Sequence, residues 1–144
     1  MQPFPHQYRV QAAGAATGTV TLSATDLPAL VTAAPAEFGG PGDLWSPETL
    51  LVAAAVNCFV LTFRAIAAGS KLPWEQLTCG GEGTLDRVDG VTRFTGLALH
   101  AQVVLPAGGD AEKAKRLLEK SERACLISNS LALQPTLTCD VDVR

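Results

Sequence analysis

Charge, aromatic residues and basic clusters are all scarce in this sequence. Charged residues make up 17% of the chain and aromatic residues 6%, and the formal net charge is −3. No stretch gathers lysine and arginine, so the electrostatic signature of nucleic-acid binding is missing, and an anionic membrane surface would not attract the chain. We therefore expect neither nucleic acid nor a membrane among its partners.

Motifs for export, membrane insertion and metal binding are missing as well. The opening stretch MQPFPHQYRV lacks the basic and apolar segments of a signal peptide. The uncharged run at 50–63 is shorter than the roughly 20 residues that a membrane span needs. None of the four cysteines forms a C-x₂-C pair, and only two histidines could join them as ligands. We expect a soluble cytoplasmic protein without a metal or an organic cofactor.

Apolar residues, in contrast, are abundant. They make up 47% of the 144 residues, and alanine, valine and leucine dominate them. The length suits one compact domain, so we expect residues 1–144 to form a single domain. Soluble monomers rarely expose large apolar patches, and the apolar excess therefore suggests that a partner subunit covers part of the surface.

A long helix is predicted in the middle of the first half. Ser46 is a good N-cap, Pro47 suits the first helical position, and Glu48 favours the positive end of the helix dipole. We expect the helix to run to about Ala68 and to close at Gly69. Short strands around a glycine-rich turn precede it, within 8–24, and a loop at 34–45 leads into it.

The second half predicts a hairpin, a shorter helix and a final strand. The hairpin turn is Asp89-Gly90, and Asp110 is a plausible N-cap for the helix. Helical spacing places Cys125 on the buried stripe of that helix. These elements together predict an α+β domain. Alternation predicts inward side chains on the two strands at Leu97, Leu99, Ala101, Val103, Leu105, Leu137, Cys139, Val141 and Val143.

The cysteines divide into two groups. Cys139 occupies an inward strand position and Cys79 has no activating neighbour, so packing explains both. Cys58 and Cys125 are predicted on helices, where buried free cysteine is also common. Asn57, beside Cys58, would need hydrogen-bond partners if it were buried. The residues alone leave open whether Cys58 packs or reacts.

Two motifs resemble those of the OsmC/Ohr family, the osmotically inducible and organic hydroperoxide resistance proteins. The stretch WSPETLLVAAAVNCFVLTFRAIA is similar to the family's helix-borne cysteine motif, and ERACLISNSL resembles its second cysteine motif. The intervening LDRVDGVTRFTGLALHAQVVLP is similar to the family's hairpin. The resemblance covers nearly the whole chain. It implies an intertwined homodimer in which antiparallel sheets surround two long central helices.

The resemblance also implies a thiol peroxidase. Cys58 would attack the O–O bond of a hydroperoxide and become a sulfenic acid, and Cys125 would resolve it as a disulfide. A dithiol such as a lipoyl protein would then restore both thiols. The apolar neighbours of Cys58 would favour small organic hydroperoxides over hydrogen peroxide, because they bury an organic tail.

The sequence departs from the family pattern at two positions. Peroxidase members carry an arginine on the loop before the helix, paired with the motif's glutamate; Glu48 matches the glutamate, but no arginine lies between Arg9 and Arg64. Arg9 is the candidate supporting cation. Leu126 stands where the family often has proline. Since Glu48 and Cys58 are about 15 Å apart along a straight helix, Glu48 would act on the partner's site, or else only on the helix dipole.

Two other functions are consistent with the same fold. The chain could be a non-catalytic binding module for a small apolar or acyl ligand, or a redox sensor without turnover, and the missing arginine favours this alternative. It could also be a structural dimer whose cysteines only pack. A Cys58 pKa at or above the free value of ~8.5 would argue against efficient peroxidase chemistry.

Overall fold

The computed structural model describes the whole chain, Met1–Arg144. The contacts within it divide the chain into two compact units, Met1–Leu50 and Leu51–Arg144. The long helix α1, Pro47–Gly69, begins in the first unit and continues through the second.

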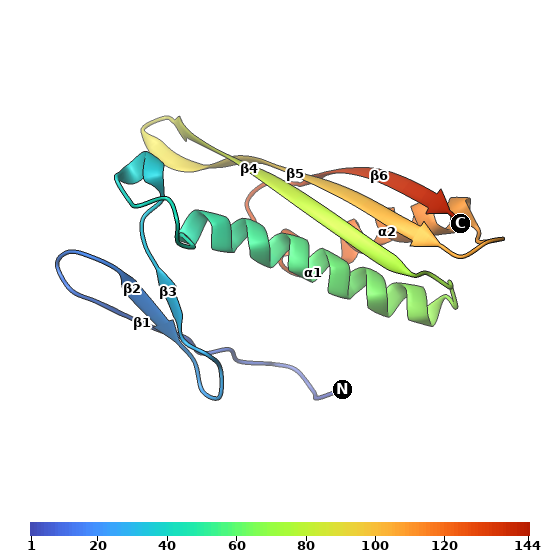
Figure 1. Ribbon diagram of the computed structural model, residues 1–144, viewed down its shortest axis with the longest axis horizontal. Coiled ribbons are helices and arrows are strands. Elements are labelled where there is room, and N and C mark those ends of the chain that lie inside the picture. Colours follow the sequence, from blue (N-terminus) through green and yellow to red (C-terminus); the bar gives the residue numbers. More distant parts are fainter. The chain divides into compact units, whose positions relative to one another are not determined.

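The N-terminal unit contains one small antiparallel sheet. Its strands are β1 (Gln11–Gly14), β2 (Val20–Ser23) and β3 (Leu30–Thr32), in the order β1-β2-β3 (Figure 1). The expected short strands around a glycine-rich turn are therefore confirmed. The expected loop at 34–45 holds one turn of 3₁₀ helix, η1 (Ala36–Phe38).

The start of α1 is fixed by a reciprocal capping arrangement. The backbone N–H of Thr49 donates to Ser46 Oγ at 3.2 Å, and the backbone N–H of Ser46 donates to Thr49 Oγ1 at 2.9 Å. Pro47 occupies the first helical position, where its missing N–H leaves no donor without a partner. The predicted N-cap is confirmed. At the other end Gly69 is the last helical residue, and the left-handed conformation falls on Lys71 (φ 53°).

The C-terminal unit is built on a long hairpin. Strands β4 (Gln76–Val88) and β5 (Val91–Leu105) pair antiparallel, and both turn residues, Asp89 (φ 52°) and Gly90 (φ 78°), are left-handed. This is the two-residue turn that the Asp-Gly pair predicts.

The last strand corrects one expectation. Strand β6 (Thr136–Val143) pairs with β5 in parallel, so the sheet β4-β5-β6 is mixed rather than antiparallel throughout. The reason is the connection: α2 (Ala111–Ala124) and the short η2 (Ser128–Ser130) lie between the two strands. A helix in the crossover carries the chain back along β5, so that Thr136 begins β6 opposite Ala98 and the two strands can pair in parallel.

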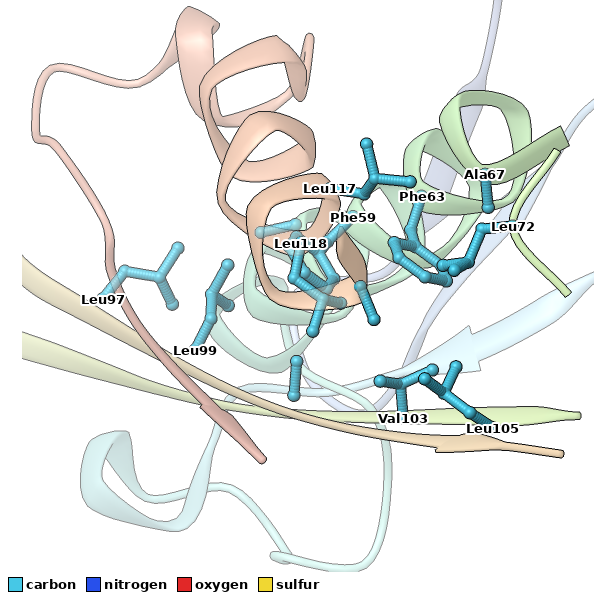
Figure 2. Packing of buried hydrophobic residues seen from close by; sticks show 13 residues of the cluster. Phe59, Phe63, Ala67, Leu72, Leu97, Leu99, Val103, Leu105, Leu117 and Leu118 are labelled. Atoms are coloured by element: carbon cyan, nitrogen blue, oxygen red, sulfur yellow. The ribbon is translucent and has the colours of Figure 1, made fainter. Parts of the chain in front are cut away.

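The core of this unit lies between the sheet and the two helices. Figure 2 shows Phe59 and Phe63 of α1 and Leu118 of α2 meeting the side chains of β5. The predicted inward residues of β5 are all buried, and Leu137, Cys139 and Val141 of β6 pack against the core. Val143 is an exception: it is 46% exposed, because it is the last residue of its strand.

Two glycines let α1 approach β4 closely. A Cβ at Gly81 would lie 2.6 Å from Val56 Cγ1, and one at Gly83 would lie 2.8 Å from Val52 Cγ2. Real Cβ atoms do not tolerate such distances, so glycine at these positions fixes how the helix seats on the strand.

Helix α1 is longer than the uncharged run inside it. With 23 residues it is long and apolar enough to cross a membrane by length and composition alone, a test that core helices of soluble proteins also pass. Ala55, Phe59, Phe63 and Ala67 are completely buried on one side. Only 22% of its most apolar window is buried, so much of its apolar surface is open in the single chain.

Candidate functional site

Cys58 lies in the middle of α1 and is half-buried. It lies one position before the buried Phe59, so its side chain borders the core rather than filling it. One turn later on the same face is Thr62, whose Oγ1 is 3.8 Å from Cys58 Sγ. Residues four apart on a helix are neighbours, which explains the contact.

Cys125 lies at the C-cap of α2, not within the helix as predicted. The helix ends at Ala124, and Cys125 leaves it with extended backbone (φ −65°, ψ 112°). Its side chain is nevertheless fully buried, as expected. The chain then turns through Leu126 and Ile127 into η2, and the backbone N–H of Asn129 donates back to the Cys125 carbonyl at 3.0 Å.

This turn brings the two cysteines together. The two thiols are close enough that each shifts the pKa of the other, and both cysteines are free rather than joined as a disulfide. The two residues that sequence analysis paired therefore do meet within one chain.

The surroundings of Cys58 favour its ionised form. Partial burial alone raises the pKa of this thiol, but hydrogen bonds from the backbone N–H of Ile127, the Cys125 thiol, the Thr62 hydroxyl and the backbone N–H of Leu126 outweigh it and lower the pKa overall. Each of these donors stabilises the thiolate more than the thiol.

Cys125 shifts in the opposite direction. Burial raises its pKa, and Cys58 raises it further because a negative charge on that sulfur disfavours a second one. The buried Ser128 hydroxyl faces the Cys125 sulfur and offsets part of the shift. Cys58 therefore ionises more readily than an ordinary thiol, whereas Cys125 keeps its proton. Such a divergence of pKa values within a pair suits the two groups to different chemical roles.

An open, almost wholly apolar pocket of about 550 Å³ adjoins Cys58. Its lining contains no charged residue, and Asn57 and Thr62 are its polar side chains. Asn57 is exposed, so its amide can be hydrated and needs no buried hydrogen-bond partner. The pocket is lined by Ala54, Asn57, Cys58, Leu61, Thr62, Ala65, Ile66, Ala124, Leu126 and Ile127.

Glu48 and Arg9, the other predicted site residues, belong to the N-terminal unit. Glu48 follows the first residue of α1, and its Oε2 is buried without a hydrogen-bond partner. It borders an apolar pocket of about 440 Å³ together with Ala33 and Phe38. The Arg9 guanidinium is exposed and donates to Gln7 Oε1.

Cys79 and Cys139 fit a packing role. Both are partly buried against the core on the inner face of the sheet. Burial and the neighbouring Cys139 raise the pKa of Cys79 to about 11, and burial likewise raises the pKa of Cys139. Neither thiol is activated. No group of three or more His, Cys, Asp or Glu side chains is arranged to hold a metal ion.

Sequence reasoning missed three of the groups at the site. Thr62 could have been found, because its spacing of four from Cys58 places both on one helical face. The N–H groups of Leu126 and Ile127 could not, because their direction depends on the chain leaving the helix at Cys125.

Comparison with known proteins gives a consistent result. The family model described as OsmC-like protein matches residues 40–140. A Bacillus subtilis protein, YmaD, described as uncharacterized, is 29% identical over 113 residues, which cover 76% of this chain and 75% of that protein.

Solved structures agree along almost the whole chain. An OsmC-like protein of unknown function from Vibrio cholerae superposes with a TM-score of 0.86 at 18% identity and covers 94% of this chain and 99% of its own. An organic hydroperoxide resistance protein OsmC from Legionella pneumophila has a TM-score of 0.76 at 28% identity, covering 98% and 100%. OhrB of Bacillus subtilis, an organic hydroperoxide resistance protein, has a TM-score of 0.68 at 20% identity, covering 95% and 98%.

Proposed function

Because the chain belongs to the OsmC family, whose model matches residues 40–140, we propose that it is a thiol-dependent peroxidase that reduces organic hydroperoxides in oxidative-stress defence. The observation that carries the proposal is the pairing of two neighbouring free thiols, beside an apolar pocket, with opposite pKa shifts, Cys58 lowered and Cys125 raised. A peroxidase needs this asymmetry, because one sulfur must attack as a thiolate and the other must wait as a thiol.

The first step is attack on the peroxide. The Cys58 thiolate attacks one oxygen of the O–O bond, the bond breaks, and the leaving alkoxide takes a proton to become an alcohol. Cys58 is thereby oxidised to the sulfenic acid and the hydroperoxide is reduced. The thiolate fraction sets the rate of this step.

The second step closes a disulfide. The Cys125 sulfur attacks the sulfenic sulfur of Cys58, the S–O bond breaks, and water leaves with the thiol proton. A dithiol of the lipoyl type then exchanges with the disulfide, becomes a disulfide itself and returns both thiols. The step needs no group beyond the two cysteines and the reductant.

The pocket supports the choice of substrate. Its apolar lining beside Cys58 removes an organic tail from water, and each buried methylene contributes about 0.8 kcal/mol. Hydrogen peroxide has no such tail and gains nothing from this wall. A small organic hydroperoxide is therefore the preferred substrate.

We also propose that the working form is a homodimer, located in the cytoplasm. Much of the apolar surface of α1 is open in the single chain, and a second copy of α1 would cover it. Glu48 Oε2 is buried without a partner, which is unfavourable unless a donor reaches it from another chain. We assign Glu48 to support the partner's thiol site, with Arg9 as the candidate cation.

Steady-state turnover tests the proposal. With dihydrolipoamide as reductant, we expect the wild type to consume cumene hydroperoxide and Cys58→Ser to consume none. We expect the wild type to consume hydrogen peroxide much more slowly than cumene hydroperoxide. The double variant Cys79→Ala/Cys139→Ala is the matched control and should keep the activity. Turnover that persists in Cys58→Ser, or none in the wild type, would reject the peroxidase.

The second candidate is a non-catalytic small-ligand-binding or redox-sensing dimer. It is favoured by one observation, the absence of any basic residue from the lining of the Cys58 pocket. A binding module would bind an apolar or acyl ligand and turn nothing over. A redox sensor would be oxidised once at Cys58, and a dithiol would not return it to the reduced state for further cycles.

A further inference from the structure

The turn that follows α2 leaves three successive backbone donors, the N–H groups of Leu126, Ile127 and Ser128, without backbone acceptors. Neither the N–H of Leu126 nor that of Ile127 donates to a carbonyl, although Cys125, Asn129, Ser130 and Leu131 around them all do. Backbone donors at a partly buried site need a partner. The N–H groups of Leu126 and Ile127 lie beside Cys58 at one pocket and lower the pKa of its thiol, whereas the N–H of Ser128 acts on Cys125.

A third donor comes from α1 itself. Thr62 Oγ1 is 3.8 Å from Cys58 Sγ, within reach of a sulfur hydrogen bond. Cys58, Thr62, Leu126 and Ile127 all line the same pocket, so the residues that carry the three donors surround one cavity with the sulfur. The titratable group that faces Cys58 in the chain is Cys125, and no charged side chain does.

We propose that Cys58 carries its negative charge in a cradle of neutral donors, the N–H groups of Leu126 and Ile127 and the hydroxyl of Thr62, which here do the work of a guanidinium. Successive N–H groups in a turn form such anion-binding concavities. The inference rests on the proposed function, because it explains how Cys58 reaches the thiolate that this function needs. Thr62 and the two N–H groups touch the reacting atom.

Leu126 is the residue that makes the cradle possible. A proline in its place would have no N–H to offer. The side chain at 126 is 67% exposed, so the contribution of this residue to the sulfur comes from its backbone. Any residue except proline would supply the same donor.

The test is the pH profile of Cys58 labelling. Wild type, Thr62→Val and Leu126→Pro are pulsed with iodoacetamide from pH 5 to pH 10, and the Cys58 peptide is quantified by mass spectrometry. We expect each variant to raise the labelling midpoint and to slow labelling at pH 7 by about tenfold, since hydrogen bonds to charged groups are the strong ones. The labelling rates of all three proteins should converge at high pH, where Cys58 is fully ionised in each. A substitution that only changed the access of iodoacetamide to Cys58 would still change the rate at high pH.

Matched controls separate the donors from packing. Thr62→Ser keeps the hydroxyl and Leu126→Ala keeps the N–H, and both should stay within about twofold of wild type. If Leu126→Pro does not fold, the pair Thr62→Val and Thr62→Ser still decides. Wild-type midpoints for both Thr62→Val and a folded Leu126→Pro would overturn the proposal.

Salt gives an independent check. Neutral donors are insensitive to ionic strength, whereas a guanidinium near the surface is screened. We expect the labelling midpoint of Cys58 to be the same at low salt and at about 1 M salt, a concentration at which charges near the surface are strongly screened. Arg9, the candidate cation, is the competing source of stabilisation: a midpoint that rises with salt and also rises in Arg9→Gln would contradict the cradle and assign this role to Arg9. Peroxide turnover is measured separately. A low labelling midpoint of Cys58 in a protein that does not turn over peroxide rejects only the proposed function. Turnover in a protein whose Thr62→Val and Leu126→Pro variants keep the wild-type midpoint rejects only the cradle.

Discussion

At the scale of single residues, two identical side chains have been given opposite acid–base properties. Cys58 faces hydrogen-bond donors and has a lowered pKa, whereas Cys125 is buried beside Cys58 and has a raised one. The difference comes from position: Cys58 lies on the open side of α1, and Cys125 closes the end of α2. The same chemistry could not be divided between Cys79 and Cys139, which both lie on the inner face of the sheet.

Removing the second thiol should trap the first intermediate. In Cys125→Ser the sulfenic acid on Cys58 has no sulfur to attack it, so one equivalent of hydroperoxide should leave a product that dimedone labels. Mass spectrometry of the Cys58 peptide measures it. Wild type treated in the same way should show little dimedone adduct, and a comparable adduct in both proteins would mean that Cys125 does not resolve Cys58.

The raised pKa of Cys79 predicts a loss of stability at alkaline pH. The folded protein holds this proton up to about pH 11. The unfolded chain releases it near ~8.5. The contribution to the free energy of unfolding is therefore complete below the lower value and is lost as pH rises between the two. Urea unfolding at several pH values should show this decline, and Cys79→Ala should make it shallower. An unchanged slope in the variant would assign the decline to other groups.

At the scale of elements, caps and turns were predictable because their chemistry is local. Ser46 and Pro47 fix where α1 begins, and Asp89-Gly90 fixes the hairpin, since a few neighbouring residues decide each. The direction of β6 was not predictable in this way. It depends on α2 carrying the chain back along the sheet, which no residue of β6 encodes.

The close approach of α1 to β4 gives a prediction at this scale. Gly81→Ala puts a Cβ 2.6 Å from Val56 Cγ1 and should reduce the free energy of unfolding by about 1–3 kcal/mol. Gly80→Ala is the matched control, because a Cβ there meets nothing within 4 Å. Chemical denaturation measures both. Equal stabilities of the two variants would show that the helix can shift away from the strand at no cost.

The first turn of α1 offers a second test. Ser46→Ala removes the oxygen that accepts from the Thr49 N–H, and should cost about 1 kcal/mol. Thermal unfolding followed by circular dichroism measures it, with Ser46→Asp as the variant that restores a cap. A destabilised Asp variant would mean that the buried hydroxyl matters for packing rather than for capping.

At the scale of the whole molecule, the apolar composition predicted apolar surface that a single copy leaves exposed, and several large apolar side chains are exposed in the single chain. The structure locates part of this surface on α1, where Leu61 is 49% exposed. Composition could indicate the excess but not its place, because the place depends on which side of α1 the sheet covers. The site followed the same pattern: the two cysteines were predictable from their motifs, and the donors around them required the fold.

The proposed homodimer leads to a prediction about this surface. Leu61→Glu puts a charge on the open side of α1 and should shift the protein towards monomer, because burying an unpaired carboxylate is costly. Sedimentation equilibrium measures the shift. Val91→Glu, at the exposed hairpin tip, is the control and should remain dimeric. If both variants have the wild-type mass, the open side of α1 is not the interface.

The central claim is that Cys58 and Cys125 form a working redox pair, and peptide mass mapping tests it most directly. The reduced protein is treated with one equivalent of cumene hydroperoxide, and in parallel with hydrogen peroxide, then alkylated and digested. We predict a Cys58–Cys125 disulfide that forms faster with the organic peroxide, while Cys79 and Cys139 stay free. Four free thiols, or oxidation scattered over Cys79 and Cys139, would contradict the claim.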